Sequence, residues 1–138
     1  MPERQNVGVP ADPVPHRLFL LRHAMTSWNQ PGAPDHDRPL APRGQRCLPG
    51  VAATIDGHLD GPLDLVLAST ATRVRDTLTG VLPRISAPHD LCWRRGLYLA
   101  SPEYLFAELN ELPDDVRTVL LCGHNPGLHQ LALDLLGD

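Results

Sequence analysis

Lysine is absent from this sequence, and all 12 of its basic residues are arginines. Schiff-base chemistry on a lysine is therefore excluded, and any anion site must use guanidinium groups. The planar fork of a guanidinium suits bidentate contacts to phosphate. The absence of lysine, together with 15 prolines, is also what a GC-rich genome would produce, so this compositional explanation stays open.

Cysteine is scarce, and an excess of positive charge is absent. Cys47, Cys92 and Cys122 lie far apart without a CxxC pair, which argues against a disulfide framework or a zinc site. This pattern favours reduced core thiols in a cytoplasmic protein. The formal net charge is -4, whereas non-specific nucleic-acid binders need a positive surface, so nucleic acid is not expected as a partner.

Long apolar runs are also missing. No segment approaches the roughly 20 apolar residues of a membrane-spanning helix, and the N-terminus lacks the apolar stretch of a signal peptide, so no membrane association is expected. At 138 residues the chain suffices for one small domain and one site. Residues 1–16 are rich in proline and predict a disordered or loosely attached tail, followed by a domain over residues 17–138.

Short apolar runs are present, and they alternate with segments of helical spacing. The expected strands are residues 18–21, 64–68, 89–93 and 118–122. The expected helices are residues 42–57, 70–82, 102–112 and 126–136. This alternation predicts an α/β fold, a three-layer α/β/α sandwich with a mostly parallel sheet. Its binding crevice should lie at the carboxyl ends of the strands.

Several details of these helices are less regular. Pro49-Gly50 predicts a kink or an early break in the first helix, and Ser69 or Thr70 is expected to cap the second. The last helix should begin near Pro126 and could direct backbone N–H groups at an anion. Its expected apolar face consists of Leu128, Leu131, Leu135 and Leu136.

Histidines and arginines follow three of the expected strands. Arg22-His23 follows the first, Ser69 to Arg73 the second, and Gly123-His124 the fourth. A two-residue motif arises easily by chance, and a lone histidine at a strand end is more often a surface residue. Together, however, arginines that bind phosphoryl oxygens and an imidazole that attacks phosphorus form a good site for phosphoryl transfer.

Three segments carry a resemblance to a known family: LLRHAMTSWNQPGAPDHDRPLAPRG, LASTATR and LLCGHNPGL. They resemble SixA-type phosphohistidine phosphatases of the histidine phosphatase superfamily, which have the phosphoglycerate mutase-like fold. The resemblance covers about residues 17 to 136. Ala24 stands where the wider superfamily has glycine in its RHG signature.

The resemblance implies a site and a mechanism. Arg22 and His23 match the RHG signature, Arg38 matches the loop arginine, and Arg73 and His124 match the remaining pocket residues. These residues would hold the phosphate while neutral His23 attacks in line, and water would then hydrolyse the phosphohistidine. The implied enzyme is a metal-independent phosphatase without a cofactor, acting on a phosphorylated protein or a small phosphorylated substrate.

The segment after the expected third strand, residues 92–98, contains no acidic residue. Superfamily members that cleave phosphate esters have a carboxylate there, because an alkoxide leaving group needs a proton donor. The imidazole of a phosphohistidine leaves readily, so the absence favours phosphoramidate substrates. Asp37 or Glu103 could still reach the site from a loop. A small-molecule phosphomonoesterase and a non-catalytic module that binds phosphorylated partners remain the alternatives.

A few further residues carry expectations. Trp28 and Tyr98 should either line the rim of the pocket or pack in the core, and His129 should be exposed. The acidic residues between 103 and 115 are expected to form a solvated face. SixA-like chains usually continue into a further strand, so either the sheet lacks an edge strand or the native chain extends past residue 138.

Overall fold

A parallel sheet carries the structure, and its strands are the short apolar runs of the sequence. The computed structural model describes residues 15–28, 32–87 and 89–137, so the prediction of an N-terminal tail falls almost wholly outside the described residues. The strands are β1 (Arg17–Arg22), β2 (Leu65–Ser69), β3 (Leu91–Arg94) and β4 (Thr118–Gly123). Each matches a predicted strand to within two residues at either end.

Helices connect these strands. The α-helices are α1 (Pro42–His58), α2 (Thr72–Val81), α3 (Pro102–Asn110) and α4 (Gly127–Leu136). Short 3-10 helices are η1 (Asp35–Asp37), η2 (Leu82–Arg84) and η3 (Arg95–Leu97). The loop between β1 and α1 contains η1 and also a bridge between Thr26 and Leu40.

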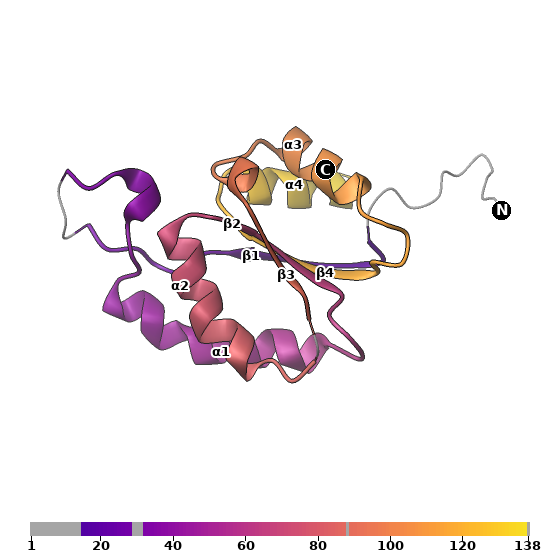
Figure 1. Ribbon diagram of the computed structural model, residues 1–138, viewed down its shortest axis with the longest axis horizontal. Coiled ribbons are helices and arrows are strands. Elements are labelled where there is room, and N and C mark those ends of the chain that lie inside the picture. Colours follow the sequence, from indigo (N-terminus) through magenta and orange to yellow (C-terminus); the bar gives the residue numbers. More distant parts are fainter. Residues whose placement is uncertain (1–14, 29–31, 88, 138) are drawn as a thin grey trace.

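The described strands lie in the order β1-β4-β2-β3, and every neighbouring pair is parallel. Helices α1 and α2 cover one face of the sheet, and α3 and α4 cover the other (Figure 1). The predicted α/β class and its three layers are thereby confirmed. Because all strands run the same way, their carboxyl ends share one edge, where a parallel sheet places its binding site.

The two faces of the sheet carry separate halves of the core. Alternate residues of a strand point to opposite faces, so Val66 and Ala68 of β2 pack toward α1 and α2, while Leu67 packs toward α3 and α4. In the same way Leu120 of β4 faces the first pair of helices and Leu121 the second. Burial on both faces explains why these strands are continuous apolar runs rather than alternating ones.

The predicted break at Pro49 does not occur, because α1 is one continuous helix from Pro42 to His58. Proline cannot donate the helical hydrogen bond and costs about 3 kcal/mol in a helix interior. Leu48 and Ile55 are 2% and 7% exposed, and burying two such side chains contributes about 3 to 6 kcal/mol. Burial of this face therefore offsets the proline.

The predicted caps and faces of two helices were wrong in part. Helix α2 begins at Thr72 with Ala71 as its N-cap residue, so Ser69 and Thr70 lie before the capping position and no side chain caps the helix. On α4, Leu128 and Leu131 are buried, but Leu135 and Leu136 are exposed. The last turn of α4 lies outside both core clusters, and Leu135 and Leu136 are 38% and 77% exposed.

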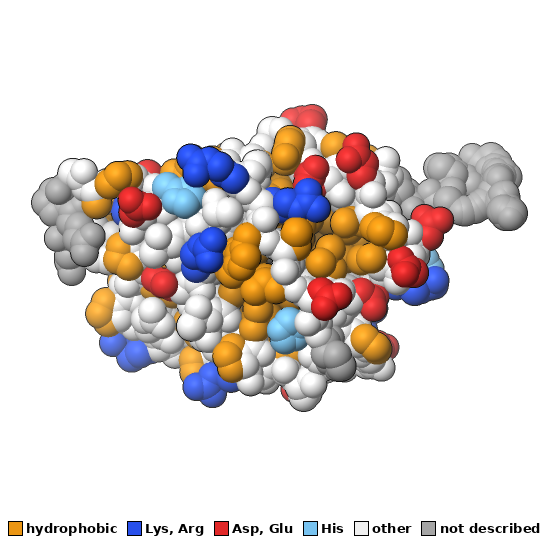
Figure 2. Space-filling view, in the orientation of Figure 1, with side chains coloured by type: hydrophobic (Ala, Val, Ile, Leu, Met, Phe, Trp, Pro, Cys, Tyr) orange, Lys and Arg blue, Asp and Glu red, His pale blue; other side chains and the backbone are white. Residues whose placement is uncertain are grey.

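The predicted burial of the cysteines holds only for Cys122, since Cys92 is half-buried and Cys47 is exposed on α1. His129 is exposed, as expected. No described helix has the length and apolar character needed to cross a membrane. On the face shown in Figure 2, acidic side chains gather toward the right, where the strands begin, and most arginines lie toward the left. On this face, the carboxyl edge of the sheet therefore carries more of the positive charge.

Candidate active site

A cavity of about 520 Å³ opens at the carboxyl edge of the sheet. Its walls bring together all five residues that the sequence singled out: Arg22, His23, Arg38, Arg73 and His124. Ala24, Met25, Thr26, Trp28, Leu99 and Asn125 complete the lining. No carboxylate is among the described residues that line this cavity.

Strand register explains why the two histidines meet. Arg22 ends β1 directly beside Gly123 at the end of β4, so the next residue of each chain segment is a histidine. The backbone N–H of His23 donates to the carbonyl of Gly123 at 3.2 Å. The imidazole rings of His23 and His124 consequently lie 5.4 Å apart, centroid to centroid.

The imidazole of His23 has its two nitrogens in different roles. Nδ1 lies 2.8 Å from the carbonyl oxygen of Ala24. Because a carbonyl only accepts, Nδ1 carries the proton, which leaves an unprotonated Nε2 whose lone pair is free to attack. The identity of residue 24 is of little consequence for this bond, since its backbone provides the acceptor.

Charge and burial keep His23 neutral. Burial lowers the pKa of His23 below its usual 6.5, and the positive charges of Arg73 and Arg22 lower it further. The hydrogen bond to Ala24 opposes these effects only in part. A neutral imidazole is the nucleophilic form, so the same arginines that would attract an anion also maintain the nucleophile.

Three arginines surround this histidine, and we call Arg22, Arg38 and Arg73 the clamp arginines. Arg73 comes from the first turn of α2, and its side chain is 5% exposed. Arg38 follows η1, and its guanidinium stacks 3.3 Å over the ring of Trp28, a cation–π contact that holds it against the cavity wall. The Arg22 side chain makes no hydrogen bond or ion pair with the rest of the described chain.

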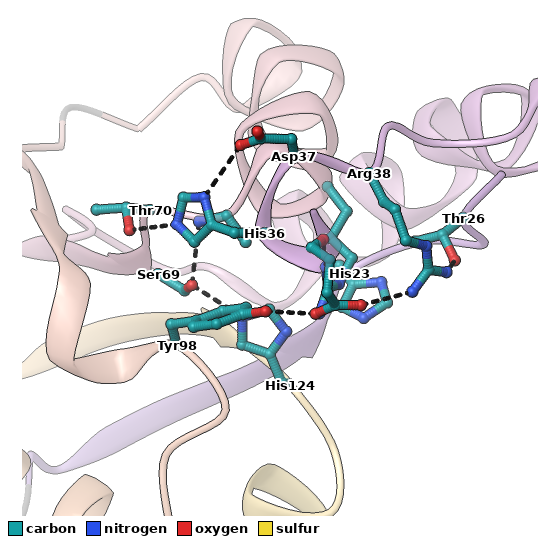
Figure 3. Close-up of polar contacts among 12 residues, drawn as sticks. His23, Thr26, His36, Asp37, Arg38, Ser69, Thr70, Tyr98 and His124 are labelled. Atoms are coloured by element: carbon teal, nitrogen blue, oxygen red, sulfur yellow. Dashed lines mark hydrogen bonds and ion pairs between the residues drawn. The ribbon is translucent and has the colours of Figure 1, made fainter. Parts of the chain in front are cut away.

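Asp35, which the sequence did not single out, ties two of the clamp arginines together. One carboxylate oxygen accepts from Arg38 Nη1 at 2.9 Å, and the other accepts from Arg73 Nη2 at 3.0 Å. Arg73 Nη1 also donates to the backbone carbonyl of Asp35 at 2.7 Å. The hydroxyl of Tyr98 donates to the same carboxylate (Figure 3). Asp35 thereby sets the direction of both guanidinium forks.

These bonds also decide the ionisation of Asp35. The hydrogen bond from Tyr98, together with those from Arg38 and Arg73, holds the pKa of this carboxyl well below its usual range despite an opposing contribution from desolvation. The group is therefore a carboxylate and cannot serve as a proton donor. Its charge leaves the three clamp arginines and Asp35 with a net charge of about +2, which matches a phosphoryl dianion.

His124 closes the opposite wall of the cavity. It is 3% exposed, and its Nε2 lies 2.8 Å from the hydroxyl of Ser69. Tyr98 packs edge-on against it at 5.3 Å between centroids. Burial, followed by the positive charge of Arg73, lowers the pKa of His124 from 6.5 to about 4. Both histidines are therefore neutral near pH 7.

This arrangement of two neutral histidines within an arginine clamp agrees with the sequence comparisons. The family model of the histidine phosphatase superfamily (branch 1) matches residues 18–92. The chain belongs to the histidine phosphatase superfamily. The expected assignment to this family from Arg22-His23 and the two downstream segments is therefore confirmed.

The proteins similar to this chain include uncharacterized relatives and solved structures. An uncharacterized protein of Mycobacterium tuberculosis is 42% identical over 117 residues, which cover 83% of this chain and 69% of the relative. The structure of SixA from Agrobacterium tumefaciens is 30% identical with a TM-score of 0.81, covering 90% of this chain and 79% of that one. The structure of the protein histidine phosphatase SixA complexed with tungstate is 25% identical with a TM-score of 0.76, covering 88% and 78%.

The two acids that the sequence offered as proton donors lie away from this site. Asp37 is directed toward His36, whose Nδ1 is 3.5 Å from its carboxylate, and its side chain is 64% exposed. Glu103 is an exposed residue on α3. Neither lines the cavity. The only acid bonded to the clamp among the described residues is Asp35, and it is ionised.

Asp35→Asn should lower kcat/KM by about tenfold, as other losses of a partner that orients a functional side chain do. An amide has one accepting oxygen, so either Arg38 or Arg73 would lose its side-chain partner. Steady-state kinetics on the preferred substrate would measure the effect. The matched control is Asp37→Asn, which removes an exposed carboxylate two residues away. Equal activities of the two variants would show that Asp35 does not orient the clamp.

The lowered pKa of His124 should make the fold sensitive to acid. In the unfolded chain this histidine titrates near 6.5, whereas in the folded protein it titrates at about 4. Between these two pKa values the unfolded state binds a proton that the folded state does not. The free energy of unfolding is therefore highest above about pH 6.5 and decreases as the pH falls toward 4. After allowance for solvent at the cavity wall, wild type should lose about 2 kcal/mol between about pH 7 and about pH 4.5 through this residue.

Urea unfolding of wild type and His124→Gln at both pH values would measure this contribution, because glutamine does not titrate. All carboxylates titrate in both proteins, so their effects cancel in the comparison. If the variant loses as much free energy of unfolding as wild type, the neutral state of His124 contributes nothing to acid sensitivity.

The rim of the cavity includes residues that the sequence left undecided or missed. Trp28 is 75% exposed and lines the cavity, so it is a rim residue. Tyr98 is half-buried behind the wall, where it holds Asp35 and His124. Leu99 also lines the cavity and has a φ of 51°, a left-handed conformation that costs a leucine about 1 kcal/mol or more. No sequence pattern indicated that residue.

In residues 15–28, 32–87 and 89–137, no three side chains of His, Cys, Asp or Glu lie close enough together to hold a metal ion. Among the described residues that line the cavity, the charged side chains are those of the clamp arginines.

Proposed function

We propose that this chain is a phosphatase that transfers the phosphoryl group of its substrate to His23 and then hydrolyses the resulting phosphohistidine. The observation that carries the proposal is the state of His23. Its Nδ1–H donates a hydrogen bond to the carbonyl oxygen of Ala24, so the unprotonated Nε2 can act as the nucleophile within a positively charged cavity. A neutral, oriented imidazole facing an anion site is the arrangement that nucleophilic catalysis on phosphorus requires.

The clamp supplies the electrostatic part of the reaction. Arg22, Arg38 and Arg73 would bind the phosphoryl oxygens as Nε2 of His23 forms a bond to phosphorus and the bond from phosphorus to the leaving nitrogen breaks. The substrate imidazole, protonated by solvent on its other ring nitrogen, takes that electron pair and leaves as neutral imidazole. A water molecule would then attack the phosphohistidine and release inorganic phosphate. Each preoriented donor of this kind typically contributes about 2.7 to 4 kcal/mol to stabilisation of the transition state.

We further propose that the substrate is a phosphoramidate, most naturally a phosphohistidine on a protein. No carboxyl group lines the cavity among the described residues, and Asp35 is held ionised by Tyr98 and two arginines. An alkoxide could not be protonated by these groups, whereas the imidazole of a phosphohistidine can take a proton from solvent on its other ring nitrogen and leave as a neutral molecule. The likeness to SixA structures supports the same substrate class.

The alternatives from the sequence are a phosphomonoesterase and a non-catalytic module that binds phosphorylated partners. The absence of an acid from the cavity wall disfavours the first. The unprotonated Nε2 of His23 disfavours the second, because a binding module has no use for a nucleophile. A cytoplasmic location and independence from metals and cofactors remain parts of this proposal.

Comparing a phosphohistidine peptide with p-nitrophenyl phosphate tests the proposal. We expect kcat/KM to be at least about tenfold higher for the peptide, corresponding to about 1.4 kcal/mol or more in transition-state stabilisation. A base-quenched reaction should yield the phosphoryl group on His23, detected by mass spectrometry. Preference for the ester would overturn the phosphoramidate assignment, and binding without turnover of either compound would overturn the enzyme itself.

A further inference from the structure

Ser69 is a buried polar residue that the mechanism above does not use. It is the last residue of β2 and is 0% exposed. Its Oγ has two contacts: the backbone N–H of Ala71 at 3.2 Å and Nε2 of His124 at 2.8 Å. Serine is a preferred N-cap residue, but Ser69 lies two residues before the N-cap position of α2, and its hydroxyl is directed at the second histidine of the site.

The bonding of Ser69 determines which nitrogen of His124 carries the proton. Ala71 provides an N–H, so Ser69 Oγ is the acceptor in that bond. The hydroxyl hydrogen then has one described acceptor, Nε2 of His124. A neutral imidazole that accepts at Nε2 carries its hydrogen on Nδ1.

Nδ1 of His124 is the atom that this arrangement leaves without a partner. It is buried and forms no hydrogen bond with any described residue. A buried N–H without an acceptor costs about 1 to 3 kcal/mol, so such a group needs an explanation. His124 lines the cavity, and its ring lies between Ser69 and His23 (Figure 3). A phosphoryl oxygen at this cavity is an acceptor that would satisfy Nδ1.

We propose that Ser69 is a positioning residue that holds His124 in the tautomer with hydrogen on Nδ1, so that neutral His124 donates to a phosphoryl oxygen. The opposite tautomer would direct a lone pair at the anion and leave the Ser69 hydroxyl without an acceptor. The donor therefore does not depend on protonation of His124, which burial disfavours. This inference rests on the proposed function, since the phosphoryl group is the acceptor.

Nitrogen NMR of the imidazole rings tests the tautomer without any assay of activity. In nitrogen-15-labelled wild type near pH 7, two-bond proton–nitrogen correlations should show hydrogen on Nδ1 of His124, with the signals assigned by their loss in His124→Gln. Hydrogen on Nε2 in wild type would overturn the proposal. In Ser69→Ala the population with hydrogen on Nε2 should rise, and Ser69→Thr, which keeps the hydroxyl, should restore the wild-type pattern.

Kinetics and anion binding test the consequence. Ser69→Ala should lower kcat by about 10- to 100-fold, the range found when the partner that orients a functional imidazole is removed. It should also weaken binding of inorganic phosphate, measured by calorimetry. The control is Ser86→Ala, which removes a hydroxyl bonded to Asp56 and away from the cavity, and which should leave both quantities unchanged.

A double-mutant cycle separates positioning from folding. If Ser69 acts through His124, adding Ser69→Ala to His124→Gln should cause no further loss of phosphate affinity, whereas a general defect in the fold would lower the affinity again.

Failure of the proposed function and failure of the role of Ser69 give different results. If His23 proves not to be the nucleophile, the proposed function fails while the tautomer and the phosphate titration still test Ser69. If wild type shows hydrogen on Nε2, only the role of Ser69 fails.

Discussion

Replacing His23 by alanine should lower kcat by at least about 10⁴-fold, the scale of loss when the nucleophile of a covalent mechanism is removed. The reason is geometric as well as chemical. His23 is the histidine with an unprotonated Nε2, and the other histidine of the cavity has its Nε2 bonded to Ser69. His124 therefore cannot take over the attack. The measurement is single-turnover hydrolysis of a phosphohistidine peptide, with the phosphoenzyme followed by mass spectrometry.

The control for this variant is His58→Ala, which removes an exposed imidazole bonded to the carbonyl of Thr54 near the end of α1. It should retain wild-type kcat and form the phosphoenzyme. Phosphate should still bind to His23→Ala, because the clamp arginines remain. A His23→Ala protein that binds phosphate and also turns over at the wild-type rate would rule out His23 as the nucleophile.

The fold was predictable because it depends on local patterns. Runs such as Leu18 to Leu21 are apolar throughout, which only burial on both faces of a sheet explains. Residues at the ends of parallel strands must share an edge, so His23 and His124 could be brought together from sequence alone. The features that failed depend on competition between distant partners. Ser69 was expected to cap α2, but the helix begins two residues later than that position requires, and the Ser69 hydroxyl contacts the buried imidazole that follows β4.

Asp35 is the site residue whose role was least predictable from the sequence. Of the acids in the loop between β1 and α1, Asp37 is the one that the sequence predicts as a possible proton donor, but its side chain is directed toward His36. The difference arises in η1, which turns Asp35 toward Arg38 three residues later and toward Arg73 on α2. A 3-10 turn in a proline-rich loop leaves little trace in the sequence. Three donors then converge on one carboxylate, and only the folded structure shows them.

Two kinds of residue therefore make up the site. The clamp arginines and the two histidines face the cavity, and their types alone indicate phosphoryl chemistry. Asp35, Tyr98 and Ser69 lie behind them and determine where their donors and lone pairs point. The sequence does not mark residues of the second kind, because the effect of each depends on a partner that only the fold brings close. Substitution of Asp35, Tyr98 or Ser69 should therefore change kcat more than it changes the free energy of unfolding.

Arg73 belongs to both sets, and its replacement should have the second largest effect. Arg73→Lys should lower kcat by about 10²- to 10³-fold, although the positive charge is kept. The guanidinium donates from two nitrogens to the backbone and carboxylate of Asp35 while it also lines the cavity. A lysine ammonium is a single point of charge, so it cannot hold Asp35 and face a phosphoryl oxygen in the same geometry.

The matched control for Arg73 is Arg75→Lys, two residues further along α2. Arg75 stacks over Trp93 at 4.4 Å and donates to the carbonyl of Thr70, outside the cavity. It should retain kcat within about twofold, since neither contact reaches the reacting groups. Thermal unfolding of both variants separates catalysis from stability, because the Arg73 side chain is 5% exposed and its loss could also weaken the fold. Wild-type kcat in a folded Arg73→Lys protein would mean that charge alone suffices, and the fork geometry imposed by Asp35 would then have no catalytic role.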